Sequence, residues 1–191
     1  MRISWMWRAV LGIMLLITAC PVSVQAQATS GRSVAAGAGA QLVESSWSGP
    51  RMGFMIAPGS GSISRNLEGH GLGSVVSEFG WQIEHRVAPV GGGPQLVTEA
   101  VPLLGGVEYG KLVPSITGIM GVRFPSGYEV GMGPSLTVVS ETTVNKGLVI
   151  AAGKSIDYGS VCIPLNLAVS TNSKGTMVSL MVGYAIHRTG Q

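Results

Sequence analysis

Residues 128–139, YEVGMGPSLTVV, alternate between apolar side chains and small or polar ones along the whole stretch. Successive side chains of a β-strand point to opposite faces, so this pattern predicts a strand with one apolar and one polar face. The apolar set is Tyr128, Val130, Met132, Pro134, Leu136 and Val138, and the other set includes Glu129, Gly131, Gly133, Ser135 and Thr137.

The composition favours lipid, rather than water, on the apolar side of such strands. Charged residues make up 11% of the 191 residues, against about 25% in a typical soluble domain. The mean hydropathy is +0.40. The length fits one domain, and the chain has no Lys/Arg cluster of the kind that binds nucleic acid, so no nucleic-acid partner is expected.

Residues 1–26 have the composition of a secretory signal peptide. Arg2 and Arg8 supply its positive start, and residues 9–19 form an uncharged apolar run. A helix needs about 20 apolar residues to span a bilayer, so this run is short for a membrane anchor. The sequence therefore predicts an exported protein.

Two processing sites compete at the end of this segment. The first expectation is cleavage after Ala26, and the alternative is lipidation of Cys20, which ends a stretch resembling a bacterial lipobox. Residues 27–50 are rich in Gly, Ala and Ser and are predicted to form a flexible leader. Residues 51–191 are predicted to form the folded domain.

Within that domain, apolar alternation and turn residues follow one another at the spacing of an all-β fold. Strands of about 9–11 residues are long enough to cross a membrane when tilted. The prediction is an antiparallel up-and-down β-barrel of about eight strands, since only closure removes sheet edges in lipid. The expected strands are residues 52–57, 77–87, 95–104, 112–123, 128–139, 147–154, 160–170 and 176–187, with a polar loop at 140–146.

The chain resembles small bacterial outer-membrane β-barrel proteins. The resemblance rests on the signal peptide, on the hairpins of residues 79–187 and on Gly-x-Gly strands such as 131–133. It implies an outer-membrane location, lipid as the surroundings, assembly by the barrel-assembly machinery and a structural or envelope-associated role without enzymatic activity. The C-terminus departs from that group, because Tyr184 is followed by a polar tail at 187–191 rather than by a terminal aromatic residue.

Four prolines keep a second fold open, because each falls inside an expected strand and lacks a backbone N–H for the ladder. They are Pro102, Pro114, Pro134 and Pro164. The alternative is a periplasmic or lipidated β-sandwich that binds an apolar ligand.

Five charged residues lie on faces assigned to the interior, and they form the candidate lumen charge cluster. A narrow barrel filled by side chains must pair its buried charges, so a structural role is expected. The alternative is a carboxylate pair that acts as acid and base. The five are Glu84, Arg86, Glu99, Arg123 and Glu129.

No diagnostic motif predicts a catalytic, cofactor or metal site. Ser135, Ser179, His85 and His187 are nucleophile or base types, but none lies in a Gly-x-Ser-x-Gly elbow. His, Cys and Asp show no metal-ligand spacing. Cys162 is expected to be a small apolar-like strand residue.

Three aromatic residues, Trp81, Tyr128 and Tyr184, are expected near strand ends at the membrane interfaces.

Overall fold

The computed structural model of the protein describes residues 42–57, 65, 68, 69, 71–140, 143–173 and 175–188. Strands make up most of this part, and a single 3-10 turn, η1 (Val107–Tyr109), lies between two of them. No helix among these residues is long and apolar enough to cross a membrane. The strands are β1 (Leu42–Ile56), β2 (Val75–Pro89), β3 (Gln95–Gly105), β4 (Val113–Arg123), β5 (Tyr128–Ser140), β6 (Thr143–Tyr158), β7 (Val161–Asn172), β8 (Gly175–Gly183) and β9 (Ala185–Arg188).

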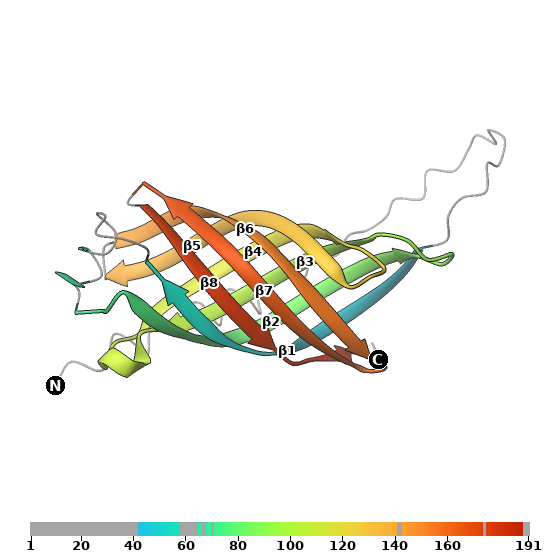
Figure 1. The fold of residues 1–191 in the computed structure, drawn as a ribbon, viewed down its shortest axis with the longest axis horizontal. Helices are drawn as coiled ribbons and strands as arrows, with labels where there is room; N and C mark the ends of the chain where they lie inside the picture. The colour runs from blue at the N-terminus through green and yellow to red at the C-terminus, as the bar shows by residue number, and fades with distance from the viewer. Residues whose placement is uncertain are drawn as a thin grey trace, which may run out of the picture. The chain divides into compact units, whose positions relative to one another are not determined.

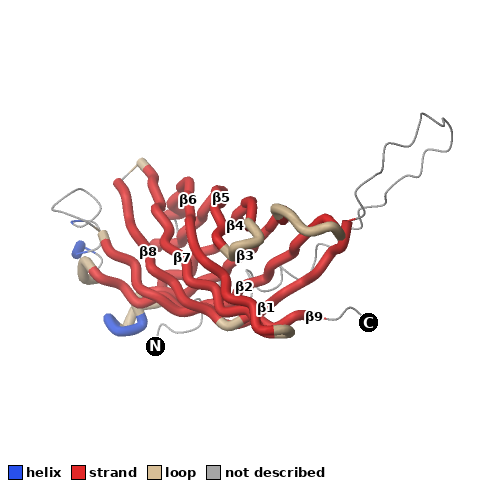
Figure 2. The backbone as a smooth tube through the Cα atoms, turned by 45° about the vertical axis from the view of Figure 1, so that its right-hand side comes forward, coloured by secondary structure: helices blue, strands red, loops and turns tan. Residues whose placement is uncertain are grey.

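The sheet closes on itself through β1. Each strand from β2 to β8 pairs antiparallel with the next, and β1 pairs with both β2 and β8. Met52 on β1, for example, lies opposite Phe79 on β2 and opposite Val182 on β8. The result is a closed antiparallel up-and-down barrel, whose strands run obliquely around its wall (Figures 1 and 2). This confirms the predicted fold class and excludes the alternative sandwich of two packed sheets.

β8 and β9 are two parts of one strand, so the barrel has eight strands. β1 pairs Arg51 with Gly183 and Ser48 with Ile186, which keeps one register across the interruption at Tyr184. Pro50 is the β1 residue opposite Tyr184 in that register, and its carbonyl accepts a 3.1 Å hydrogen bond from the Tyr184 N–H. Because a proline has no N–H to return, the ladder is incomplete at this point.

The prolines inside the other strands are accommodated in the same way, without a shift of register. β4 pairs Thr117 with Ser135 and Met120 with Met132, and the ladder skips the positions between them, where Pro134 lies. The β2–β3 ladder likewise skips Pro102 and resumes in register. The ladder is therefore interrupted over two residue pairs at each of these prolines, and the alternation of faces stays intact.

The two faces of each strand are separated as predicted. Val130, Met132 and Leu136 are 53%, 55% and 41% exposed on the outside, whereas Glu129 and Ser135 are 8% and 9% exposed on the inside. On β2, Phe79, Trp81 and Ile83 face outward while Gln82, Glu84 and Arg86 are buried. Apolar side chains thus cover the outer wall, and the inside combines charged and polar side chains with a smaller apolar set that includes Val101, Leu103 and Met181.

Several boundaries differ from the prediction. β1 begins at Leu42, so residues 42–50 belong to the barrel rather than to the leader. Extended pairing with β2 orders this segment despite its small residues. β6 begins at Thr143 and not at residue 147, because pairing with β5 continues after a bulge at Val138/Ser140 and shortens the predicted polar loop. The predicted signal peptide, the rest of the leader and Cys20 lie outside the described residues.

Candidate functional site

The five residues of the predicted lumen charge cluster come from four consecutive strands and meet inside the barrel. β2 carries Glu84 and Arg86, β3 carries Glu99, Arg123 ends β4, and Glu129 lies near the start of β5. The strand register already places two of these pairs side by side, since Glu84 lies opposite Glu99 and Arg123 lies opposite Glu129. All five are buried, with exposed fractions of 1–9%.

Arg123 links three carboxylates of this cluster. Its Nη1 donates to Glu84 Oε1 at 2.8 Å and its Nη2 donates to Glu84 Oε2 at 3.2 Å, a two-pronged contact. Its Nε donates to Glu129 Oε2 at 2.7 Å. Its Nη2 also lies 4.0 Å from Glu99 Oε1. A planar guanidinium suits this role because its donors form a rigid fork that matches carboxylates.

Glu84 is the most heavily bonded carboxylate of the cluster. Besides Arg123, it accepts from the Nε of Arg86 and from the side-chain amide of Gln82. Both of its oxygens are therefore occupied by donors. A carboxylate held in this way has no free oxygen to take up a substrate proton, so the structural interpretation fits it better than acid–base catalysis.

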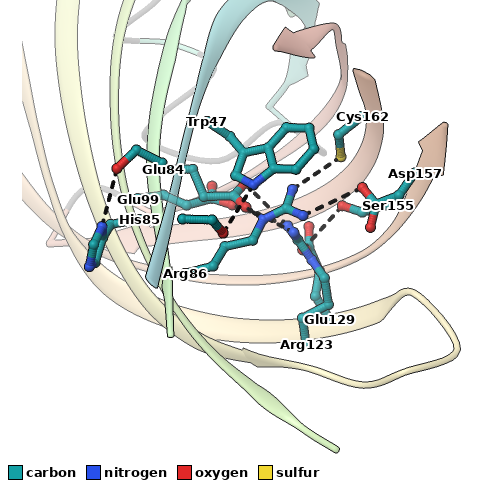
Figure 3. A network of polar contacts seen from close by, with 12 residues as sticks. Trp47, Glu84, His85, Arg86, Glu99, Arg123, Glu129, Ser155, Asp157 and Cys162 are labelled. Carbon is teal, nitrogen blue, oxygen red and sulfur yellow. Dashed lines mark hydrogen bonds and ion pairs between the residues drawn. The ribbon is translucent and has the colours of Figure 1, made fainter. Parts of the chain in front are cut away.

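Arg86 extends the cluster toward the barrel end that holds the β6–β7 turn. Its guanidinium lies over the Trp47 ring, with Cζ 4.2 Å from the ring centroid (Figure 3). Its Nη1 lies 3.4 Å from Asp157 Oδ1, and its Nη2 lies 3.3 Å from Cys162 Sγ. The Trp47 ring also meets His187 edge-on at 5.1 Å. Cation–π and ionic contacts together leave Arg86 with partners on several sides.

Three further interior residues join the network and were not in the predicted cluster. Arg51 Nε donates to Gln82 Oε1 at 2.8 Å, and its Nη1 donates to Asn166 Oδ1 at 2.8 Å. Its Nη2 lies 3.5 Å from Glu99 Oε2. Asn166 in turn donates to Glu129. Gln82 has the same strand parity as Glu84 and Arg86, and Asn166 lies on the small and polar face of β7, whereas Arg51 is the first residue of the predicted folded domain.

The charges of this network balance. Arg51, Arg86 and Arg123 face Glu84, Glu99 and Glu129, and every one of these six takes part in an ion pair. The network spans strands on opposite sides of the barrel, because Arg51 on β1 donates to Asn166 on β7 and Asn166 donates to Glu129 on β5. We call these six residues and their partners Gln82 and Asn166 the ionic plug.

The other residues considered for chemistry lie apart from the plug. His85 faces outward, where its Nδ1 is 3.3 Å from Ser46 Oγ and its Nε2 is 3.7 Å from Glu44. Ser135 faces inward and bonds Thr117 Oγ1 at 3.2 Å. His85 therefore contacts Ser46, whereas Ser135 contacts a threonine and no histidine in the described residues. Cys162 is the exception to this separation, because its buried free thiol contacts Arg86 of the plug.

The predicted interfacial aromatic residues are all exposed. Tyr128 begins β5, and Lys154 Nζ lies 4.9 Å from the centroid of its ring. Tyr184 lies at the interruption between β8 and β9. Trp81 differs from the prediction, because it lies in the middle of β2 rather than near an end. The long β1–β2 hairpin accounts for this, since β2 continues well past Trp81 to Pro89.

No family model matches the chain, and no curated protein matches it. Among solved structures, it is similar to the outer-membrane protein Ail of Yersinia pestis in three determinations. The structure in a phospholipid bilayer nanodisc has 13% identity and a TM-score of 0.46, over 74% of this chain and 99% of that one. The crystal structure has 12% identity and a TM-score of 0.48, over 76% and 97%. The crystal structure with the heparin analogue sucrose octasulfate has 11% identity and a TM-score of 0.47, over 76% and 97%. The closed antiparallel barrel of this chain is established by its own strand pairing.

Proposed function

We propose that this protein is an integral β-barrel of the bacterial outer membrane with a structural or envelope-associated role and no enzymatic activity. The observation that carries the proposal is the inverted distribution of side chains in a closed barrel. Large apolar residues are exposed around the outer wall, while three arginines and four glutamates are buried inside. A water-soluble barrel would place these two sets the other way round.

The outer wall fits lipid for a second reason. Soluble proteins rarely expose apolar patches larger than a few hundred Å², since water disfavours them. Here every strand from β1 to β8 contributes exposed aliphatic or aromatic side chains. The closed sheet also leaves no open edge, which is the condition for a sheet to reside in a bilayer. Examples from successive strands are Phe54, Ile83, Leu96, Met120, Met132, Ile150, Leu167 and Leu180.

The ionic plug supports a barrel that is not an open pore. Eight strands enclose a lumen that side chains can fill. The plug joins β1, β2, β3, β4, β5 and β7 by ion pairs and hydrogen bonds between charged or amide side chains. Such a network obstructs the lumen and braces opposite walls against each other. Assembly is assigned to the barrel-assembly machinery, which inserts barrels of this architecture.

Membrane extraction combined with gel migration tests the proposal. The protein is expected to stay in the membrane pellet after alkaline carbonate washing. It is also expected to migrate differently in a dodecyl sulfate gel before and after boiling, because a closed barrel resists unfolding by the detergent at room temperature. Release into the carbonate supernatant together with identical migration of boiled and unboiled samples would contradict the proposal.

A further inference from the structure

The lumen contains a second compartment beside the ionic plug. It has about 700 Å³ of empty space, its open mouth included. Arg51, Glu99 and Asn166 of the plug form one side of it. Thr137 near the end of β5 and Met177 near the start of β8 line it as well, so it extends toward that end of the barrel.

This compartment holds both buried polar side-chain atoms that lack a hydrogen-bond partner among the described residues. They are Arg51 Nη2 and Glu78 Oε2. The Arg51 atom still has an ion pair, at 3.5 Å from Glu99. Glu78 is 9% exposed and takes part in no ion pair within the described part of the chain. A buried carboxylate oxygen with no partner is costly, so it marks a position where a partner is missing.

The charge balance of the described interior points to the sign of that partner. The buried cations are Arg51, Arg86 and Arg123, and the ionic plug matches them with three glutamates. Glu78 is a fourth buried glutamate, so the interior carries one negative charge in excess when all four carboxyl groups are ionised. A single positive charge beside Glu78 would neutralise it.

The surroundings of Glu78 combine flexible methionines with small hydroxyl residues, of which Ser179 forms a side-chain hydrogen bond with the Glu78 carboxyl group. Gly53 on β1 lies opposite Glu78 on β2 and opposite Met181 on β8, so the smallest residue separates the carboxylate from a methionine. Met55 and Met177 also line the compartment, together with small hydroxyl residues such as Ser179. Methionine side chains are flexible and fit themselves to apolar groups of different shape.

We propose that this compartment binds a small organic cation, a primary ammonium with a short apolar body, and that Glu78 is its counter-ion. The ammonium supplies three donors to the unpartnered carboxylate oxygen and nearby hydroxyls. The apolar body packs against the methionines. Two carboxylates, Glu78 and Glu99, line the space with one guanidinium, Arg51, which is ion-paired with Glu99, so the net charge of the lining is negative and an anion is disfavoured. A neutral molecule leaves the excess charge unmatched. This binding site goes beyond the membrane role proposed above.

Methionine methyl signals provide a direct test with pentylammonium as the probe. The protein is refolded into phosphatidylcholine nanodiscs with ¹³C-methyl methionine, and folding is verified by the gel shift before titration. Met55, Met177 and Met181 report on the compartment, whereas Met52, Met120 and Met132 are exposed on the outer wall and report on partition into lipid. Saturable shifts of the first group alone are expected, and 1-pentanol and pentanoate are expected to produce much weaker ones.

Two test variants and one control variant establish the role of Glu78 and of the compartment. Glu78→Gln should weaken pentylammonium binding by about tenfold or more, because it removes a charge-assisted hydrogen bond. Glu44→Gln, at an exposed carboxylate on the outside, is the matched control and should leave binding unchanged. Ala168→Leu keeps Glu78 and fills part of the compartment, so it should also weaken binding and serves if Glu78→Gln does not fold.

Three results would overturn the proposal. They are equal shifts of all six methionine methyls, equal binding of 1-pentanol, and unchanged affinity in Glu78→Gln. Absence of any saturable shift would assign the space to water or to a proton on Glu78 and would overturn it too. Because the gel shift is read first, a failed titration of a folded barrel leaves the membrane role standing.

Discussion

Glu84 on β2 and Glu99 on β3 lie directly opposite each other on paired strands, with both carboxyl groups inside the barrel. Like charges in this position destabilise a sheet. Arg123, two strands from Glu84, compensates by placing its guanidinium 2.8 Å from Glu84 and 4.0 Å from Glu99. A cation from β4 thus permits a carboxylate pair on β2 and β3, which makes Arg123 the residue on which the ionic plug most depends.

Replacing Arg123 with methionine should therefore destabilise the barrel strongly. Removing one partner of a buried ion pair costs about 3–5 kcal/mol, because the remaining charge stays buried without compensation. The free energy of unfolding, measured by urea titration in lipid vesicles, checks this. Lys154→Met, at an exposed cation on β6, is the control and should change stability by less than about 1 kcal/mol.

Neutralising the residue left unpaired should recover part of that loss. In the Arg123→Met background, Glu129→Gln is expected to restore stability, because Arg123 is the only ion-pair partner of Glu129 among the described residues and its removal leaves that buried charge uncompensated. If the double variant loses as much free energy of unfolding as the two single variants combined, the two residues act independently.

Lysine substitutions along β5 test which face meets lipid. Met132→Lys and Leu136→Lys place a cation on the outer wall, where it costs about 2–4 kcal/mol at the bilayer midplane and about 0–1 kcal/mol near the interfaces. Thr137→Lys and Ser135→Lys point into the lumen compartment, where hydroxyls and carboxylates surround a cation. Folding yield in vesicles should be lower for the first two variants, and equal yields on both faces would rule out a lipid-facing wall.

The close approach of β4 and β5 at Gly133 should make alanine intolerable there. A Cβ at Gly133 would collide with the backbone carbonyl of Gly118, and backbone cannot move aside as a side chain does. Gly118→Ala is a matched control on the neighbouring strand, since no atom lies within 4 Å of its added Cβ. Comparing heat-modifiable migration of the two variants gives the answer: only Gly133→Ala should lose the folded band.

The η1 turn holds a carboxyl group that should titrate below its usual range. The limited burial of Glu108 raises its pKa, but hydrogen bonds from the Ser77 hydroxyl and backbone N–H outweigh that effect and lower the pKa overall. A lowered pKa means that this contact stabilises the fold at neutral pH and is lost as the pH falls through that pKa. An NMR titration should show the low midpoint, and Ser77→Ala should move it upward; an unchanged midpoint would contradict the assignment.

The N-terminal segment should be absent from the mature protein. Intact-mass measurement distinguishes the two processing routes, because a chain starting at Gln27 indicates simple cleavage and a triacylated Cys20 indicates a lipoprotein. A mature protein that retains Met1 through Ala26 would contradict both routes.

The alternation of residues 128–139 was enough to predict the two faces of β5, because side-chain direction in a strand depends only on position parity. The same local rule predicted the strands, the barrel class and the interior placement of Glu84, Arg86, Glu99, Arg123 and Glu129. Local pattern therefore determined which side chains face inward.

Local pattern could not determine which inward side chains meet. Arg51 donates to Asn166 on β7 because closure of the barrel places β1 beside β8 and therefore two strands from β7. No local sequence pattern predicts that contact. The start of β1 at Leu42 has the same cause, since its small residues are ordered by pairing with β2 rather than by their own propensity. The lack of a partner for Glu78 Oε2 likewise could not be predicted from the sequence. It depends on which carboxylates pair with the buried arginines, and the closed lumen determines those pairs.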